Sequence, residues 1–136
     1  MRSLTMLLAV SCTWLACGGG GRQTPLVASP SVPAAEGSVQ TRRTADQNTE
    51  LSVAVEHLAP PDRVATGATT YVVWAQPLGD GTKPQNVGAM RVGRDRSGSL
   101  KTKTPHQSFE LSVTPEVSPT VTEPTNQPVF KAKVAQ

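Results

Sequence analysis

The side chains best suited to chemistry are few, and they are widely spaced in this chain of 136 residues. The two cysteines, Cys12 and Cys17, lie close to the amino terminus, and the two histidines are His57 and His106. A serine or cysteine nucleophile needs a base and an orienting acid beside it, and no Gly-x-Ser-x-Gly motif occurs. We therefore expect no catalytic residues and predict that the protein is not an enzyme.

Metal and cofactor sites find no better support. Two distant histidines, with no cysteine after Cys17, do not supply the ligands of a zinc site. Asp80 lies in a turn sequence that lacks the further carboxylates of a calcium loop. Glu110 and Glu116 lie on or after a predicted strand, with no apolar pocket evident to separate their pKa values. The sequence predicts no metal, no cofactor and no small-molecule substrate.

The first seventeen residues have the pattern of an export signal. Arg2 precedes an apolar run that reaches from Leu4 to Leu15, and Ala16 stands directly before Cys17. This run is shorter than the roughly 20 apolar residues of a transmembrane helix, so we expect no permanent membrane-spanning segment here. Cleavage before Cys12 would leave an apolar core of only residues 4–11, so Cys17 fits better.

This segment resembles the signal peptide of bacterial lipoproteins, in which the lipobox cysteine is acylated and becomes the first residue of the mature chain. The resemblance implies a signal peptide over residues 1–16 and a lipid on Cys17. It also implies export, with the protein lipid-anchored to a bacterial membrane and facing the periplasm or the cell surface. Gly18 stands where an Asp favours inner-membrane retention in many relatives, so the outer membrane is favoured. Ordinary secretion without a lipid is the alternative.

Residues 17–47 have the composition of a linker. The chain passes through Gly18 to Gly21 and then through prolines, alanines and serines with few large apolar side chains. Such a stretch buries too little surface to offset its ordering entropy. We expect a lipidated cysteine followed by a flexible spacer that spans roughly 30 Å. The Arg42-Arg43 pair beside Asp46 is expected to be solvated.

From residue 48 to residue 136 the pattern has period two, which is typical of strands. The run 69–75 is apolar on both faces, as expected for a central strand that is covered on both sides. Six to seven short strands without a helical pattern predict an all-β fold, a small antiparallel immunoglobulin-like β-sandwich. We expect most of its aromatic side chains in one core between the sheets. The predicted strands cover residues 51–55, 69–75, 86–92, 99–104, 108–114 and 129–134.

Three segments of this region occur in a suggestive order: Tyr71-Val-Val-Trp-Ala-Gln-Pro-Leu, Asn86-Val-Gly-Ala and Ser108-Phe-Glu-Leu-Ser-Val-Thr-Pro-Glu. Over residues 69–134 they resemble the extracytoplasmic domain of anti-sigma-K-type factors, which is a small β-sandwich. The order Pro115-Glu116 inverts the Glu-Pro of that family, and we expect neither its sigma-binding domain nor its transmembrane helix. The resemblance implies a fold and an extracytoplasmic location, and it does not imply sigma-factor inhibition.

Charge is the remaining guide to function. The chain carries 13 basic and 10 acidic residues, which is too balanced for a nucleic-acid-binding protein. A local excess of basic residues is opposed only by Asp95, and Lys131 and Lys133 would join it if the last strand pairs nearby. One interpretation is a binding surface for an envelope protein or an anionic surface. The other is that lysines protect an exposed sheet edge from pairing. The five residues of this candidate basic surface are Arg91, Arg94, Arg96, Lys101 and Lys103.

Two classes of function remain open from the sequence. The first is a non-catalytic binding or structural module of the cell envelope, attached to the membrane by its lipid. The second is an accessory regulatory or sensory protein related to the extracytoplasmic domain of anti-sigma factors.

Overall fold

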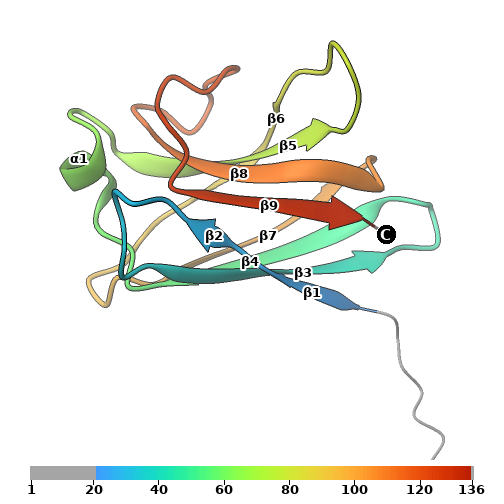
Figure 1. Ribbon diagram of the computed structural model, residues 1–136, viewed down its shortest axis with the longest axis horizontal. Helices are drawn as coiled ribbons and strands as arrows, with labels where there is room; N and C mark the ends of the chain where they lie inside the picture. Colours follow the sequence, from blue (N-terminus) through green and yellow to red (C-terminus); the bar gives the residue numbers. More distant parts are fainter. Residues whose placement is uncertain (1–20, 136) are drawn as a thin grey trace, which may run out of the picture.

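The computed structural model describes residues 21–135, which form a nearly all-β protein (Figure 1). The signal segment and Cys17 lie outside the described residues. Nine strands make two antiparallel sheets, and the one helix in this range, α1 (Pro61–Val64), has four residues. The prediction of a small antiparallel β-sandwich is confirmed.

Every strand expected after residue 48 is present, and most are longer than the pattern indicated. Strands end where prolines or turn residues interrupt the alternation, because proline cannot donate a ladder hydrogen bond. Pro60-Pro61 follows the first of them and begins α1, where the missing N–H of proline costs nothing. The six strands are β4 (Thr49–Glu56), β5 (Thr70–Pro77), β6 (Gln85–Met90), β7 (Gly98–Thr104), β8 (Ser108–Glu116) and β9 (Phe130–Ala135).

Three further strands correct the expected linker at residues 17–47. They are β1 (Arg22–Pro25), β2 (Val27–Ala28) and β3 (Glu36–Arg43). In β3, Val39 is fully buried while its neighbours Ser38 and Gln40 remain at least partly exposed, so even this polar strand has an inward face. β3 pairs with β4 along its whole length, so its backbone N–H and C=O groups are hydrogen-bonded. This pairing stabilises β3 although the strand has few large apolar side chains.

The amino-terminal segment is shared between the two sheets. β1 pairs with β3, and β2, two residues later, pairs with β9 in the opposite sheet. Leu26 lies at the crossing point; its side chain is 7% exposed and its N–H donates to the carbonyl oxygen of Gly37 at 2.9 Å. The sheet orders are β1-β3-β4-β7 and β2-β9-β8-β5-β6, so this segment closes one edge of each sheet.

The core lies between the sheets, and three of the four aromatic side chains expected there belong to it: Tyr71, Phe109 and Phe130. Trp74 is also fully buried, but it lies outside this cluster. It alternates along β5 with the core residues Val73 and Ala75, so it projects from the outer face of the five-stranded sheet. The segment 117–128 passes over this outer face (Figure 1).

Candidate functional site

The candidate basic surface is divided between a turn and a strand. Arg91 follows β6, and Arg94 and Arg96 lie in the turn that leads into β7; all three are exposed. Lys101 and Lys103 are exposed on β7 itself. Since a strand rises about 3.3 Å per residue, Lys103 lies roughly 17 Å along β7 from Gly98, where the turn ends. The five residues therefore form two separate basic groups.

Two further lysines do not extend this surface. Lys131 and Lys133 lie on β9, which belongs to the five-stranded sheet, whereas β7 belongs to the four-stranded sheet. The last strand does not pair near β7, because the two strands are in different layers, so the two lysines do not join the basic residues there. Lys131 instead lies 3.8 Å from a carboxylate oxygen of Glu110 on β8.

The lysines of β7 stand at a sheet edge. β7 is the last strand of its sheet and pairs only with β4 in that sheet, where Lys103 is opposite Glu50 and Lys101 is opposite Ser52. Arg42 donates to Glu50 at 2.6 Å. This hydrogen bond and the charge of Arg42 hold the pKa of Glu50 below its usual value, and both lysines add to the effect. The other side of β7 lies beside β6, where the Thr102 hydroxyl donates to the carbonyl oxygen of Val87 at 2.6 Å, so the edge that the lysines would protect is partly covered.

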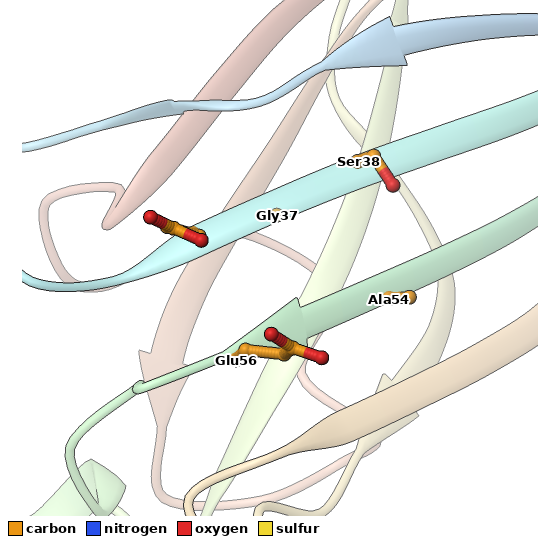
Figure 2. Close-up of a pocket in the computed structure, with 5 residues that line it drawn as sticks. Gly37, Ser38, Ala54 and Glu56 are labelled. Carbon is orange, nitrogen blue, oxygen red and sulfur yellow. The ribbon is translucent and has the colours of Figure 1, made fainter.

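The outer face of the four-stranded sheet is hollowed where small residues line it. Figure 2 shows the carboxylate of Glu56 on β4 at one end of such a hollow, with Gly37, Ser38 and Ala54 beside it. Glu36 on β3 also lines this hollow. The hollow has a volume of about 320 Å³. Glu36 and Glu56 are direct cross-strand partners, and like charges in that position destabilise a sheet.

This hollow has a limited chemical repertoire. Its two carboxylates are exposed, and across residues 21–135 neither of them is within an ion-pair distance of a basic side chain. The same range contains no group of three or more His, Cys, Asp or Glu residues placed to hold a metal ion. What remains is a small polar surface with two hydrogen-bond-accepting groups.

The two histidines lie at opposite ends of β4. His57 directly follows β4 and is exposed, with a positive φ of 55°. His106 lies near the first residue of β4, since Thr49 donates to its carbonyl oxygen at 2.8 Å. The imidazole Nε2 of His106 is 2.8 Å from Oε1 of Gln85. The fold thus does not bring the histidines together.

A buried polar network is the feature that the sequence did not reveal. Glu116 is fully buried and accepts a hydrogen bond from the Thr114 hydroxyl at 2.7 Å. Thr125 donates to the same carboxylate through both its N–H, at 2.9 Å, and its hydroxyl. The Thr114 hydroxyl in turn accepts from Nε1 of Trp74 at 2.8 Å. One sequence pattern did point to this network: residues 69–75 are apolar on both faces of the strand. Such a strand needs another segment to cover Trp74 on the outer face.

Comparison of the chain with protein-family models, with curated proteins and with solved structures gives no match in any of the three. Among residues 21–135, no helix has both the length and the apolar character needed to cross a bilayer. The sequence pattern around Cys17 and the fold are therefore the basis of the functional proposal.

Proposed function

We propose that this protein is an exported bacterial lipoprotein, acylated on Cys17, whose β-sandwich is a non-catalytic binding or structural module of the cell envelope. The observation that carries the proposal is the export-signal pattern that ends in Ala16-Cys17. The structure adds the position of β1, which begins at Arg22, only five residues after Cys17. A lipid at Cys17 would be joined directly to a segment whose two strands, β1 and β2, pair with opposite sheets. The anchor would thereby hold the folded module close to the membrane, without a long spacer.

The surface of the module supports binding or scaffolding more than catalysis. The hollows of about 320 Å³ and 300 Å³ lie on the outer face of the four-stranded sheet and are lined mostly by polar and charged residues. Ligand sites for small molecules are concave and largely apolar, with a few convergent polar groups. A charged sheet face fits a macromolecular surface better.

Metabolic labelling with a radioactive fatty acid tests the anchor. We expect label on the wild-type chain and on a Cys12→Ala variant, and no label on Cys17→Ala. Equal labelling of the wild type and Cys17→Ala would refute the lipoprotein proposal. Fractionation of the outer and inner membranes then locates the labelled protein, which we expect in the outer membrane.

Crosslinking in intact cells tests the binding module. A photoreactive amino acid at Ser52, in the middle of the outer sheet face, should give a discrete crosslinked species that contains an envelope protein or peptidoglycan. Thr66, on the turn after α1, is an exposed control position away from this face. Identical products from both positions, or none from Ser52, would exclude a binding role for the sheet face.

A second candidate function is an accessory regulatory or sensory role. The segments that resemble the anti-sigma extracytoplasmic domain contain Trp74, Thr114 and Glu116, and these three residues meet in one buried network. The resemblance of these segments is the basis of this second candidate. Deletion of the chromosomal copy followed by transcript profiling tests it: a regulator should change a defined set of transcripts, and a structural module should not.

A further inference from the structure

The short connection between Cys17 and β1 limits how far the sandwich can stand from a lipid on Cys17. Five residue steps separate Cys17 from Arg22, where β1 begins. A fully extended chain spans at most about 3.6 Å per residue, so this connection reaches at most about 18 Å. With the lipid in the bilayer, the end of the sandwich at which β1 begins must therefore lie next to the headgroups.

That end of the sandwich is defined by the strand pairing. Arg22 pairs with Thr41 near the end of β3, and Thr49 at the start of β4 pairs with Thr104 at the end of β7. Figure 1 shows the start of β1 at the same end of the molecule as the turn between β3 and β4 and the end of β9. We call this the anchor end. The turn between β6 and β7 and helix α1 lie at the opposite end.

Basic side chains surround the anchor end on the four-stranded sheet. Arg22, Arg42, Arg43 and Lys103 are all exposed there. Two acidic residues lie beside them: Glu50 is paired with Arg42 at 2.6 Å, and Asp46 accepts from Asn48 at 3.0 Å and from the Thr44 hydroxyl, which are neutral donors. The four basic residues therefore exceed the acidic residues beside them by two charges. The loop between β5 and β6 adds one charge of each sign.

Two of these cations, Arg22 and Arg43, have no acidic partner in the part of the chain that the structure describes. Arg43 donates to the neutral amide oxygen of Gln47 at 3.3 Å, and Arg22 donates to the carbonyl oxygen of Ala135 at 3.1 Å. Lys103 forms no ion pair within residues 21–135, but it lies opposite Glu50, and its charge lowers the pKa of both Glu50 and Asp46. The charges of Arg22 and Arg43 are available to an external anion, and Lys103 adds to the local positive excess.

We infer that the anchor end is a second membrane contact, at which Arg22, Arg43 and Lys103 bind the anionic headgroups of the bilayer that holds the lipid. This inference rests on the proposed lipid anchor. A basic patch is one of the signals that add to a lipid in membrane attachment. The contact would fix the sandwich upright, with α1 and the turn that carries Arg94 and Arg96 directed away from the membrane.

The test uses the lipidated chain in vesicles with an environment-sensitive fluorophore on a single introduced cysteine. The thiol of Cys17 is consumed by the lipid and Cys12 is removed with the signal, so an introduced cysteine is the only free thiol. Ala45→Cys places the probe in the turn at the anchor end, and Thr66→Cys places it at the opposite end; both positions are exposed. The vesicles contain phosphatidylcholine alone, or phosphatidylcholine and phosphatidylglycerol in equal parts, with a headgroup quencher.

We expect the probe at position 45 to be quenched at least about twofold more strongly in the anionic vesicles, because each basic residue near an anionic surface raises partitioning roughly fivefold. Salt at about 1 M should abolish the difference, since the screening length falls to about 3 Å. The probe at position 66 should show no such dependence. Equal quenching at position 45 in the two vesicle types overturns the inference.

A matched pair of charge variants makes the test specific. Arg43→Gln with Lys103→Gln should remove most of the anionic dependence, whereas Arg91→Gln with Arg94→Gln makes the same charge change at the opposite end and should leave it intact. Equal loss in both variants would show a nonspecific charge effect and refute the docking surface. Mass spectrometry of the purified chain reports the lipid separately, so an unlipidated chain refutes the proposed function, and a lipidated chain without anionic dependence refutes only the docking.

Discussion

Glu116 and Thr125 are joined by two hydrogen bonds, because the buried carboxylate of Glu116 accepts from both the backbone N–H and the hydroxyl of Thr125. Glu116 is the last residue of β8, and Thr125 lies in the segment that returns to β9. The pair therefore fixes the proline-containing segment 117–128 over the outer face of the five-stranded sheet. Asn126, which donates to the carbonyl oxygen of Pro115 at 2.7 Å, adds a further contact.

Glu116→Ala should lower the free energy of unfolding by about 2–4 kcal/mol, because it leaves three buried or partly buried donors without their acceptor. Glu123→Ala, in the same segment but exposed, is the control and should change it by less than about 0.5 kcal/mol. Urea denaturation followed by circular dichroism measures both. Equal effects of the two substitutions would mean that the carboxylate is not structurally important.

Asn86→Ala should loosen the segment 117–128 without unfolding the sandwich. The Asn86 amide donates to the carbonyl oxygens of Pro119 and Val121, each at 2.9 Å, so it holds the middle of the segment. Trp74 is the only tryptophan of a chain that begins at Cys17, and it reports on this cover. We expect its fluorescence to become more accessible to acrylamide, while stability falls by only about 1–2 kcal/mol. Unchanged quenching would indicate that Asn86 does not hold the cover.

Leu26→Ala should cost about 2–4 kcal/mol of stability, because Leu26 is buried at the point where the amino-terminal segment passes between the sheets. Its neighbour offers a matched control. Val27 is 71% exposed, and Val27→Ala should change stability by less than about 0.5 kcal/mol. Thermal and urea unfolding give the comparison. If Leu26→Ala were as mild as Val27→Ala, residues 21–28 would not be part of the cooperative domain.

The ion pair between Arg42 and Glu50 makes a specific pH prediction. Arg42 lowers the pKa of Glu50 from its usual 4.5, so the charged form is favoured in the folded protein. The corresponding stabilisation is present above about pH 4.5 and is lost as the pH falls through the lower folded value. In Arg42→Gln, the pKa of Glu50 should move back toward 4.5, as NMR titration of its carboxyl carbon would show.

Arg43→Gln is the control for that titration. Arg43 neighbours Arg42 and carries the same charge, but its guanidinium contacts Gln47 and not Glu50. It should leave the pKa of Glu50 almost unchanged. A similar shift in both variants would assign the effect to general charge and not to the hydrogen bond at 2.6 Å.

Several strands could be predicted because they carry their own signal. Leu51, Val53 and Val55 in β4 and Phe130, Ala132 and Val134 in β9 alternate with polar residues, and the period of two by itself specifies a half-buried strand. Prolines and glycines mark the ends. The outer cover over β5 was also implied by its residues, which are apolar on both faces, but the identity of the covering segment was not.

β1, β2 and β3 could not be predicted in this way. Their residues include glycine, serine, proline and arginine, and few of them are large and apolar. They are strands because the edges of two existing sheets offer them backbone hydrogen bonds and a place for Leu26 and Val39. These hydrogen bonds and packing contacts are made with residues distant in the sequence, so the local sequence pattern does not predict the three strands.

Alternation and proline boundaries act over a few residues, so the amino-acid sequence alone was enough to specify the class of fold and to mark the basic residues and Cys17 as candidates. The arrangement of those candidates came from the folded chain. Folding separated Arg94, in the turn before β7, from Lys103 near the end of that strand. The pairing of β3, β4 and β7 brought Lys103 to the same end of the sandwich as Arg43. It also buried Glu116 beneath Thr125. These relationships depend on the register and order of strands, which are set by packing between distant segments.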